Sequence, residues 1–111
     1  MLRGEVRANR GLYRTNHGEN ALEDFDLAIA DLNRAIELKN DEAWYWAWRG
    51  HSRLRRASAL ENRQEVVEAR REYQAAAHDY TEAIRLDPSK MEAEMGPWRN
   101  EALTKAARLS P

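Results

Sequence analysis

The histidines, at positions 17, 51 and 78, are the side chains in this 111-residue chain best suited to acid-base or metal chemistry. They lack the three- or four-residue spacing of helical metal ligands, and the chain has no cysteine to complete a zinc site. Asp79 directly follows His78, but neighbouring residues on a helix point in different directions, so we expect His78 to face solvent. The sequence therefore predicts no metal site and no cofactor.

Signatures of covalent or phosphoryl chemistry are also missing. The sequence contains no glycine-rich phosphate loop, no nucleophile elbow and no pair of carboxylates in an apolar setting. The lack of cysteine excludes disulfides and thiolate chemistry. No apolar run approaches the roughly 18 residues that a membrane span requires, and the first residues do not lead into a secretory core. We expect a cytoplasmic protein that is not an enzyme and does not contact a membrane.

The elements that would carry any function are helices. Only five glycines and three prolines interrupt a chain rich in Ala, Leu, Glu and Arg, which favour helix, and strand patterning is absent. The sequence therefore predicts an all-α fold. Asn40 or Asp41 should cap the third helix, and Pro97 should kink or restart the last. The five expected segments cover residues 2–15, 21–38, 41–60, 62–86 and 89–109.

One phrase occurs twice in the sequence. Residues 27–38 return as residues 75–86, each with a small residue, a large apolar residue four positions later and Ala three positions after that. Leu32 and Tyr80 hold the large position in the two copies. Repetition of this kind is typical of stacked helical units that bind partners, rather than of one catalytic fold.

The repeated residues resemble the second-helix signature of the tetratricopeptide repeat family, whose unit is an antiparallel helix pair of about 34 residues. The second copy matches in full with Ala76, Tyr80, Ala83 and Pro88, and the first matches with Ala28, Leu32 and Ala35, with Asn40 in place of proline. The resemblance implies that Gly11 and Gly50 lie where the two helices of a pair approach closely. It also implies a single domain over residues 1–111: two stacked hairpins, at about 4–40 and 41–88, and a capping helix at about 89–109.

Both predicted hairpins are longer than the family's. The interval from Gly50 to Ala76 is 26 residues, which exceeds the family's spacing because of an insertion in the pair. The extra residues lie between the glycine and the second-helix alanine. We therefore expect them to lengthen the tip of the second hairpin, over residues 53–72.

Function in this family lies on the concave groove formed by the first helices. The groove positions that the resemblance marks as partner-binding fall on Glu5, Asn9, Leu12, Trp44, Trp48, His51 and Arg55. Trp44, Trp48 and His51 follow one another at helical spacing, and aromatic and Arg side chains are the usual anchors of binding hot spots. The alternative is that these tryptophans pack against the neighbouring helix, and we expect Trp46, on another side, to belong to the core.

Charge alternates between predicted helices, with a net +2 over residues 41–60 and −3 over residues 61–87. Either neighbouring helices complement each other, or the basic inner face attracts an acidic peptide in a salt-dependent way. Nucleic acid is a third partner class, because Arg53, Arg55 and Arg56 lie close together near aromatics. A pI near 6.3 and interleaved carboxylates argue against it.

The function that the sequence favours is a scaffold that binds a peptide or helix of a partner protein. Self-assembly is the alternative from another class, because two repeats leave apolar end surfaces that a longer array would bury. An RNA-binding helical repeat is the third reading. The carboxylate clamp of family members that bind chaperone tails is absent, since its positions hold Ala8, Leu12, Trp48, Glu92 and Gly96.

Overall fold

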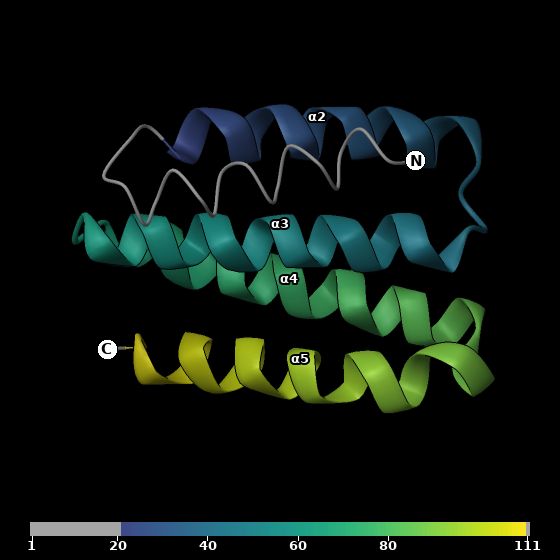
Figure 1. Ribbon diagram of the computed structural model, residues 1–111. Coiled ribbons are helices and arrows are strands. Elements are labelled where there is room, and N and C mark those ends of the chain that lie inside the picture. The colour runs from purple at the N-terminus through teal and green to yellow at the C-terminus, as the bar shows by residue number, and fades with distance from the viewer. Residues whose placement is uncertain (1–20, 111) are drawn as a thin grey trace.

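The computed structural model describes residues 21–110, which form four α-helices joined by short turns (Figure 1). The helices are α2 (Ala21–Leu38), α3 (Ala43–Asn62), α4 (Val66–Leu86) and α5 (Pro88–Arg108). No strand occurs within residues 21–110, so the all-α prediction is confirmed for this part of the chain. The helix expected over residues 2–15 lies outside the described residues.

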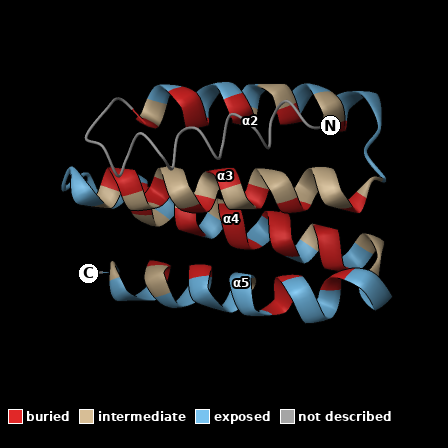
Figure 2. Ribbon diagram, viewed as in Figure 1, coloured by how far each residue is buried: buried red, intermediate tan, exposed pale blue. Residues whose placement is uncertain are grey.

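Each helix packs antiparallel against the next one in the chain, and α3 and α4 form the centre of the arrangement (Figure 1). The apolar side chains at three-and-four spacing on α2 face α3, and Phe25 and Leu32 are almost completely buried. Buried positions on the four helices turn toward one another, and exposed positions lie on the outer sides (Figure 2). The large buried side chains of the last three helices include Leu54, Leu60, Tyr73, Tyr80, Ile84, Met91 and Met95.

The N-cap of α3 is Glu42, so the expectation of Asn40 or Asp41 is wrong. The Glu42 carboxylate accepts a hydrogen bond from the backbone N–H of Trp44 at 3.4 Å. Asp41 is engaged elsewhere, because its carboxylate pairs with the Lys39 ammonium at 2.9 Å. Any nearby carboxylate can satisfy the free N–H groups of a helix start, and here the one left available forms the cap.

The hairpin tip between α3 and α4 is a short turn, and α4 begins at Val66 rather than near residue 62. Gln64 has a φ of 63°, and the two backbone bonds of a Schellman motif close the turn, from Gln64 N to Glu61 O and from Glu65 N to Leu60 O. Glycine usually marks the left-handed residue of such a turn, and because this chain has Gln64 there, the turn could not be predicted from the sequence. The extra length expected over residues 53–72 is therefore almost entirely helical.

The stop between α4 and α5 lies at Asp87 and Pro88, as expected, but α5 does not restart at Pro97. Gly96 lacks the Cβ that would press against the proline ring, which removes the usual clash at the residue before a proline. Pro97 and Ala93 are both exposed, so the Ala93 carbonyl that loses its helical partner can bind water. The helix continues through the proline to Arg108.

The close approach expected at Gly50 is present between α3 and α4. A Cβ placed on Gly50 would lie 2.8 Å from Cε1 of Tyr80, whose side chain is fully buried. The Tyr80 ring therefore occupies the space that any larger residue at position 50 would need. This contact lets the two long helices pack with their axes close together.

We expect Gly50→Ala to lower the free energy of unfolding by about 1–2 kcal/mol, because overpacking against Tyr80 outweighs the gain in helix propensity. Chemical denaturation followed by circular dichroism measures the change. In a Tyr80→Leu background the ring edge is gone, so the same substitution should become neutral or stabilising. An equal loss in both backgrounds would show that the contact is not the cause.

A buried ion-pair cluster joins α3 to its two neighbours. The Asp79 side chain on α4 has no exposed surface, and the Arg49 guanidinium binds it through two hydrogen bonds of 2.9 and 3.0 Å. Arg53 adds a third contact to the same carboxylate at 3.1 Å. Arg49 also donates to the Asn33 side chain of α2 at 2.8 Å. Two turns of α3 are thus held against α4 and α2 by one arginine pair.

Arg56 repeats this bridging one turn further along α3. Its guanidinium pairs with Asp26 of α2 at 2.7 Å and with Glu72 of α4. Three of the four arginines on α3 are therefore neutralised by carboxylates of the flanking helices. For these three, the alternation of charge reflects neighbouring helices that complement each other.

We expect Asp79→Asn to destabilise the fold by about 3–5 kcal/mol, because removing one partner of a buried pair leaves the guanidinium groups uncompensated. The measurement is the free energy of unfolding from urea titration. Glu82→Gln is the matched control, since it removes the partner of a largely exposed Arg85 on the same helix and should change stability by less than about 0.5 kcal/mol. Equal effects would contradict the prediction.

Candidate functional site

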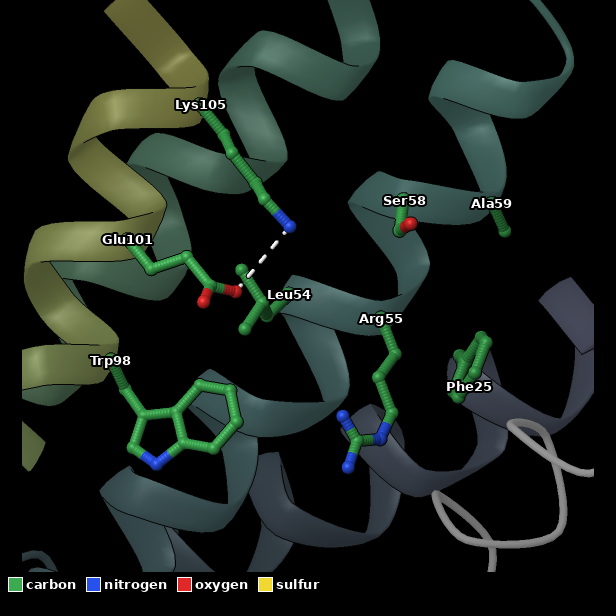
Figure 3. Close-up of a pocket in the computed structure, with 8 residues that line it drawn as sticks. All are labelled: Phe25, Leu54, Arg55, Ser58, Ala59, Trp98, Glu101 and Lys105. Atoms are coloured by element: carbon green, nitrogen blue, oxygen red, sulfur yellow. Dashed lines mark ion pairs between the residues drawn. The ribbon is translucent and has the colours of Figure 1, made fainter. Parts of the chain in front are cut away.

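A pocket of about 150 Å³ lies over α3, between α2 and α5 (Figure 3). Its floor and apolar wall include Leu54 and Phe25, both almost completely buried. We call this feature the α3 pocket. The residues that line it are Phe25 from α2, Leu54, Arg55, Ser58 and Ala59 from α3, and Trp98, Glu101 and Lys105 from α5.

The α5 wall of the pocket is half apolar and half charged. Trp98 remains 36% exposed, so much of its ring is open to a ligand. Glu101 and Lys105 form an ion pair at 3.3 Å one turn further along (Figure 3). Trp98, Glu101 and Lys105 share one face of α5 because they follow at three- and four-residue spacing. The pocket thus combines an aromatic surface with a charged rim.

Arg55 is the exception among the arginines of α3. Within residues 21–110 no carboxylate forms an ion pair or hydrogen bond with its guanidinium, and the side chain is only partly exposed. Arg55 lies on a different side of the helix from Arg49, Arg53 and Arg56, and this side faces the pocket. The pocket carries one positive charge that its own residues leave uncompensated.

His51 lies between the core and the pocket. Its Nδ1 and the Tyr80 hydroxyl share a hydrogen bond of 2.8 Å, and its ring contacts Trp98 edge-on with centroids 5.2 Å apart. Burial lowers the pKa of His51 to about 4, and the charge of Arg55 adds to this effect. His51 is therefore neutral at physiological pH and is held in place by hydrogen bonding and ring contacts.

The predicted groove residues fall into two groups. His51 and Arg55 lie together beside α5, as described above. Trp44 and Trp48 lie with ring centroids 6.1 Å apart on the same helix, do not line the α3 pocket, and Trp44 packs against the hydrophobic core. The remaining predicted residues, Glu5, Asn9 and Leu12, lie outside the described residues.

Trp46 is not the core residue that we expected. Its side chain is half-buried, its indole N–H donates to the Asn40 carbonyl at 3.0 Å, and the Arg49 guanidinium lies 4.9 Å from its ring centroid. It packs against the edge of the core rather than inside it. The polar indole nitrogen explains this place, since it needs a partner near the turn. His78, in contrast, is exposed to solvent as expected.

The sequence interpretation missed the α5 wall of the pocket. It treated the last helix as a cap, although Trp98, Glu101 and Lys105 already mark one face by their spacing. It also missed Phe25, Leu54 and Ser58, which carry no signal beyond helix amphipathicity. Only their meeting in space makes them a site.

The chain matches no protein-family model, and no curated protein or solved structure matches it. Residues 21–110 contain no group of three His, Cys, Asp or Glu side chains placed to hold a metal ion. Among the four helices described, none has the length and apolar character to cross a membrane.

The depressed pKa of His51 makes stability depend on pH. The unfolded chain binds a proton at this residue below about pH 6.5, whereas the folded chain does so only near pH 4. Stability from this residue is therefore fully present above pH 6.5 and falls as the pH drops toward 4. By about pH 5 the loss should reach roughly 2 kcal/mol.

His51→Gln keeps a hydrogen-bonding group at this position and removes the titration. The stability of this variant, measured by urea unfolding between pH 7.5 and about 5, should fall by less than that of the wild type. His78→Gln alters an exposed histidine and should leave the wild-type pH dependence in place. Parallel curves for the wild type and His51→Gln would rule out His51 as the titrating group.

Proposed function

We propose that this protein is a non-enzymatic scaffold of tetratricopeptide-like architecture that binds a peptide or helix of a partner protein. The observation that carries the proposal is the α3 pocket, where three helices surround one exposed tryptophan and one arginine that pairs with no carboxylate of residues 21–110. Trp and Arg dominate binding hot spots when they lie in such concave settings. The repeated sequence phrase and the Gly50 contact with Tyr80 support the architecture.

The size of the pocket favours a side-chain anchor over a metabolite. A volume of about 150 Å³ equals that of an engineered apolar cavity that accepts benzene. Sites for drug-sized ligands and cofactors are larger, at about 300–1,000 Å³. One aromatic or branched aliphatic side chain fills the α3 pocket, and the rest of a peptide would lie along α3 and α5.

The ionisable groups of the pocket also favour binding over catalysis. Glu101 and Lys105 neutralise each other, and His51 is hydrogen bonded to Tyr80. An acid-base catalyst needs a group with a pKa near the working pH, whereas the pKa of His51 is about 4. Arg55 offers recognition of an anion but no proton transfer.

We expect a random peptide library displayed on phage to yield peptides that bind the full chain and lose binding in Ser58→Trp. The new indole would fill the pocket from α3. Gln74→Trp is the matched control, because it adds the same side chain at an exposed position of α4 and should keep binding. Circular dichroism establishes that both variants fold. Failure to enrich any peptide, or full binding by Ser58→Trp, would contradict the proposal.

Self-assembly is the second candidate. One exposed stripe of α5, formed by Ala93, Pro97, Asn100, Leu103 and Ala107, contains no charged residue, and half of the Leu103 side chain is exposed. Sedimentation velocity of the same proteins without peptide separates the two candidates. A concentration-dependent increase in mass that persists in Ser58→Trp would show self-association that does not require the α3 pocket.

A further inference from the structure

The charges around the α3 pocket do not balance. Arg49, Arg53 and Arg56 are all bound by carboxylates of α2 or α4. In the part of the chain that the structure describes, Arg55 has no such partner. The nearest acidic group on the pocket wall, Glu101, already pairs with Lys105 at 3.3 Å. The lining therefore carries a net charge of one, located at the Arg55 guanidinium.

Partial burial makes this charge strong. The Arg55 side chain is only partly exposed, so water screens it less than it screens a surface arginine. Its field reaches the interior, because it contributes to the lowered pKa of His51. A ligand carboxylate could accept two parallel hydrogen bonds from the guanidinium fork, which is the strongest arrangement available to arginine.

The apolar part of the pocket lies directly beside this guanidinium. Leu54 and Arg55 of α3 and Trp98 of α5 all line this one pocket (Figure 3). The space of about 150 Å³ holds one phenyl-sized group. Because the charged and apolar parts belong to one small pocket, the two matching groups of a ligand must come from one residue or from neighbouring residues.

Taking the proposed peptide-binding function as its basis, we propose that the α3 pocket recognises a carboxylate directly adjacent to an aromatic or branched aliphatic side chain. The carboxylate pairs with Arg55, and the apolar group lies between Leu54 and Trp98. Asp or Glu beside such a residue supplies this chemistry, and so does a C-terminal residue of that type with its free carboxylate. A basic segment is disfavoured, because the pocket is already positive.

The test uses four N-acetylated dipeptides and NMR titration of the full-length protein, following the Leu54 methyl groups and the Trp98 indole N–H. N-acetyl-Asp-Phe-amide carries a side-chain carboxylate, and N-acetyl-Gly-Phe with a free carboxyl end carries a terminal one. N-acetyl-Asn-Phe-amide and N-acetyl-Gly-Phe-amide are the uncharged partners of each. Ligands this small should bind in the millimolar range.

At least one carboxylate probe should bind about tenfold more tightly than its uncharged partner. The preference for that probe identifies the source of the carboxylate. Arg55→Gln should reduce the ratio to about one, Arg55→Lys should retain part of it, and higher salt should weaken it. Arg71→Gln, which removes an exposed arginine of α4, should leave the ratio unchanged.

The outcomes separate this inference from the proposed function. If the uncharged probes bind as tightly as the carboxylates, the proposed recognition of a carboxylate by Arg55 is overturned, whereas the proposed peptide-binding pocket is not. A second outcome is that no probe shifts the pocket signals, although library peptides bind the wild type and fail to bind Ser58→Trp. The proposal that the pocket recognises a carboxylate next to an apolar side chain is then wrong. If neither library peptides nor probes bind the wild-type protein, the proposed peptide-binding function is itself refuted.

Discussion

The buried carboxylate of Asp79 fixes how α3 lies against its neighbours. It has no exposed surface, so Arg49 and Arg53 rather than water must compensate its charge. Hydrogen bonds to a carboxylate are directional, and two of them come from the planar Arg49 fork. These bonds set the rotation of α3 about its own axis. The same rotation brings Gly50 under the Tyr80 ring, where only glycine fits.

Once this rotation is set, helical geometry assigns the remaining side chains of α3. Positions 49, 53 and 56 share one face, so three arginines meet the carboxylates of α4 and α2. Residues 51 and 55 fall on another face, toward α5, where His51 contacts Trp98. One helix thus separates the arginines that bind carboxylates of neighbouring helices from Arg55, which pairs with no carboxylate of residues 21–110. A basic helix does not by itself indicate a basic surface.

Much of the helical frame could be predicted from the sequence, because apolar spacing and the Asp87-Pro88 stop are local signals. The Schellman turn could not, since Gln64 takes the left-handed conformation that glycine usually marks. A Gly-Pro pair in a sequence usually predicts the end of a helix. In α5, Gly96 instead allows the helix to continue through Pro97, because it has no Cβ to clash with the proline ring. Arg55 and His51 were found from their repeat positions, but the Trp98 wall depends on the rotation of α5, which no local pattern specifies. Trp46 was expected in the core because of its large apolar ring, but its indole N–H donates to a backbone carbonyl near the turn and keeps the ring at the edge of the core.

Arg55 pairs with no carboxylate of residues 21–110, and part of the reason lies on α5. Glu101 precedes Lys105 by four residues, the favoured order for an ion pair on a helix, so this carboxylate is satisfied within its own element. His51, one helical turn before Arg55, is kept neutral by burial and so contributes no charge to the pocket. The carboxylate nearest to Arg55 on the pocket wall is therefore occupied, and the neutral imidazole of His51 adds no charge, so the charge of Arg55 determines the sign of the pocket. Within residues 21–110 no acidic side chain pairs with Arg55, and the ligand carboxylate that we propose would supply that negative charge.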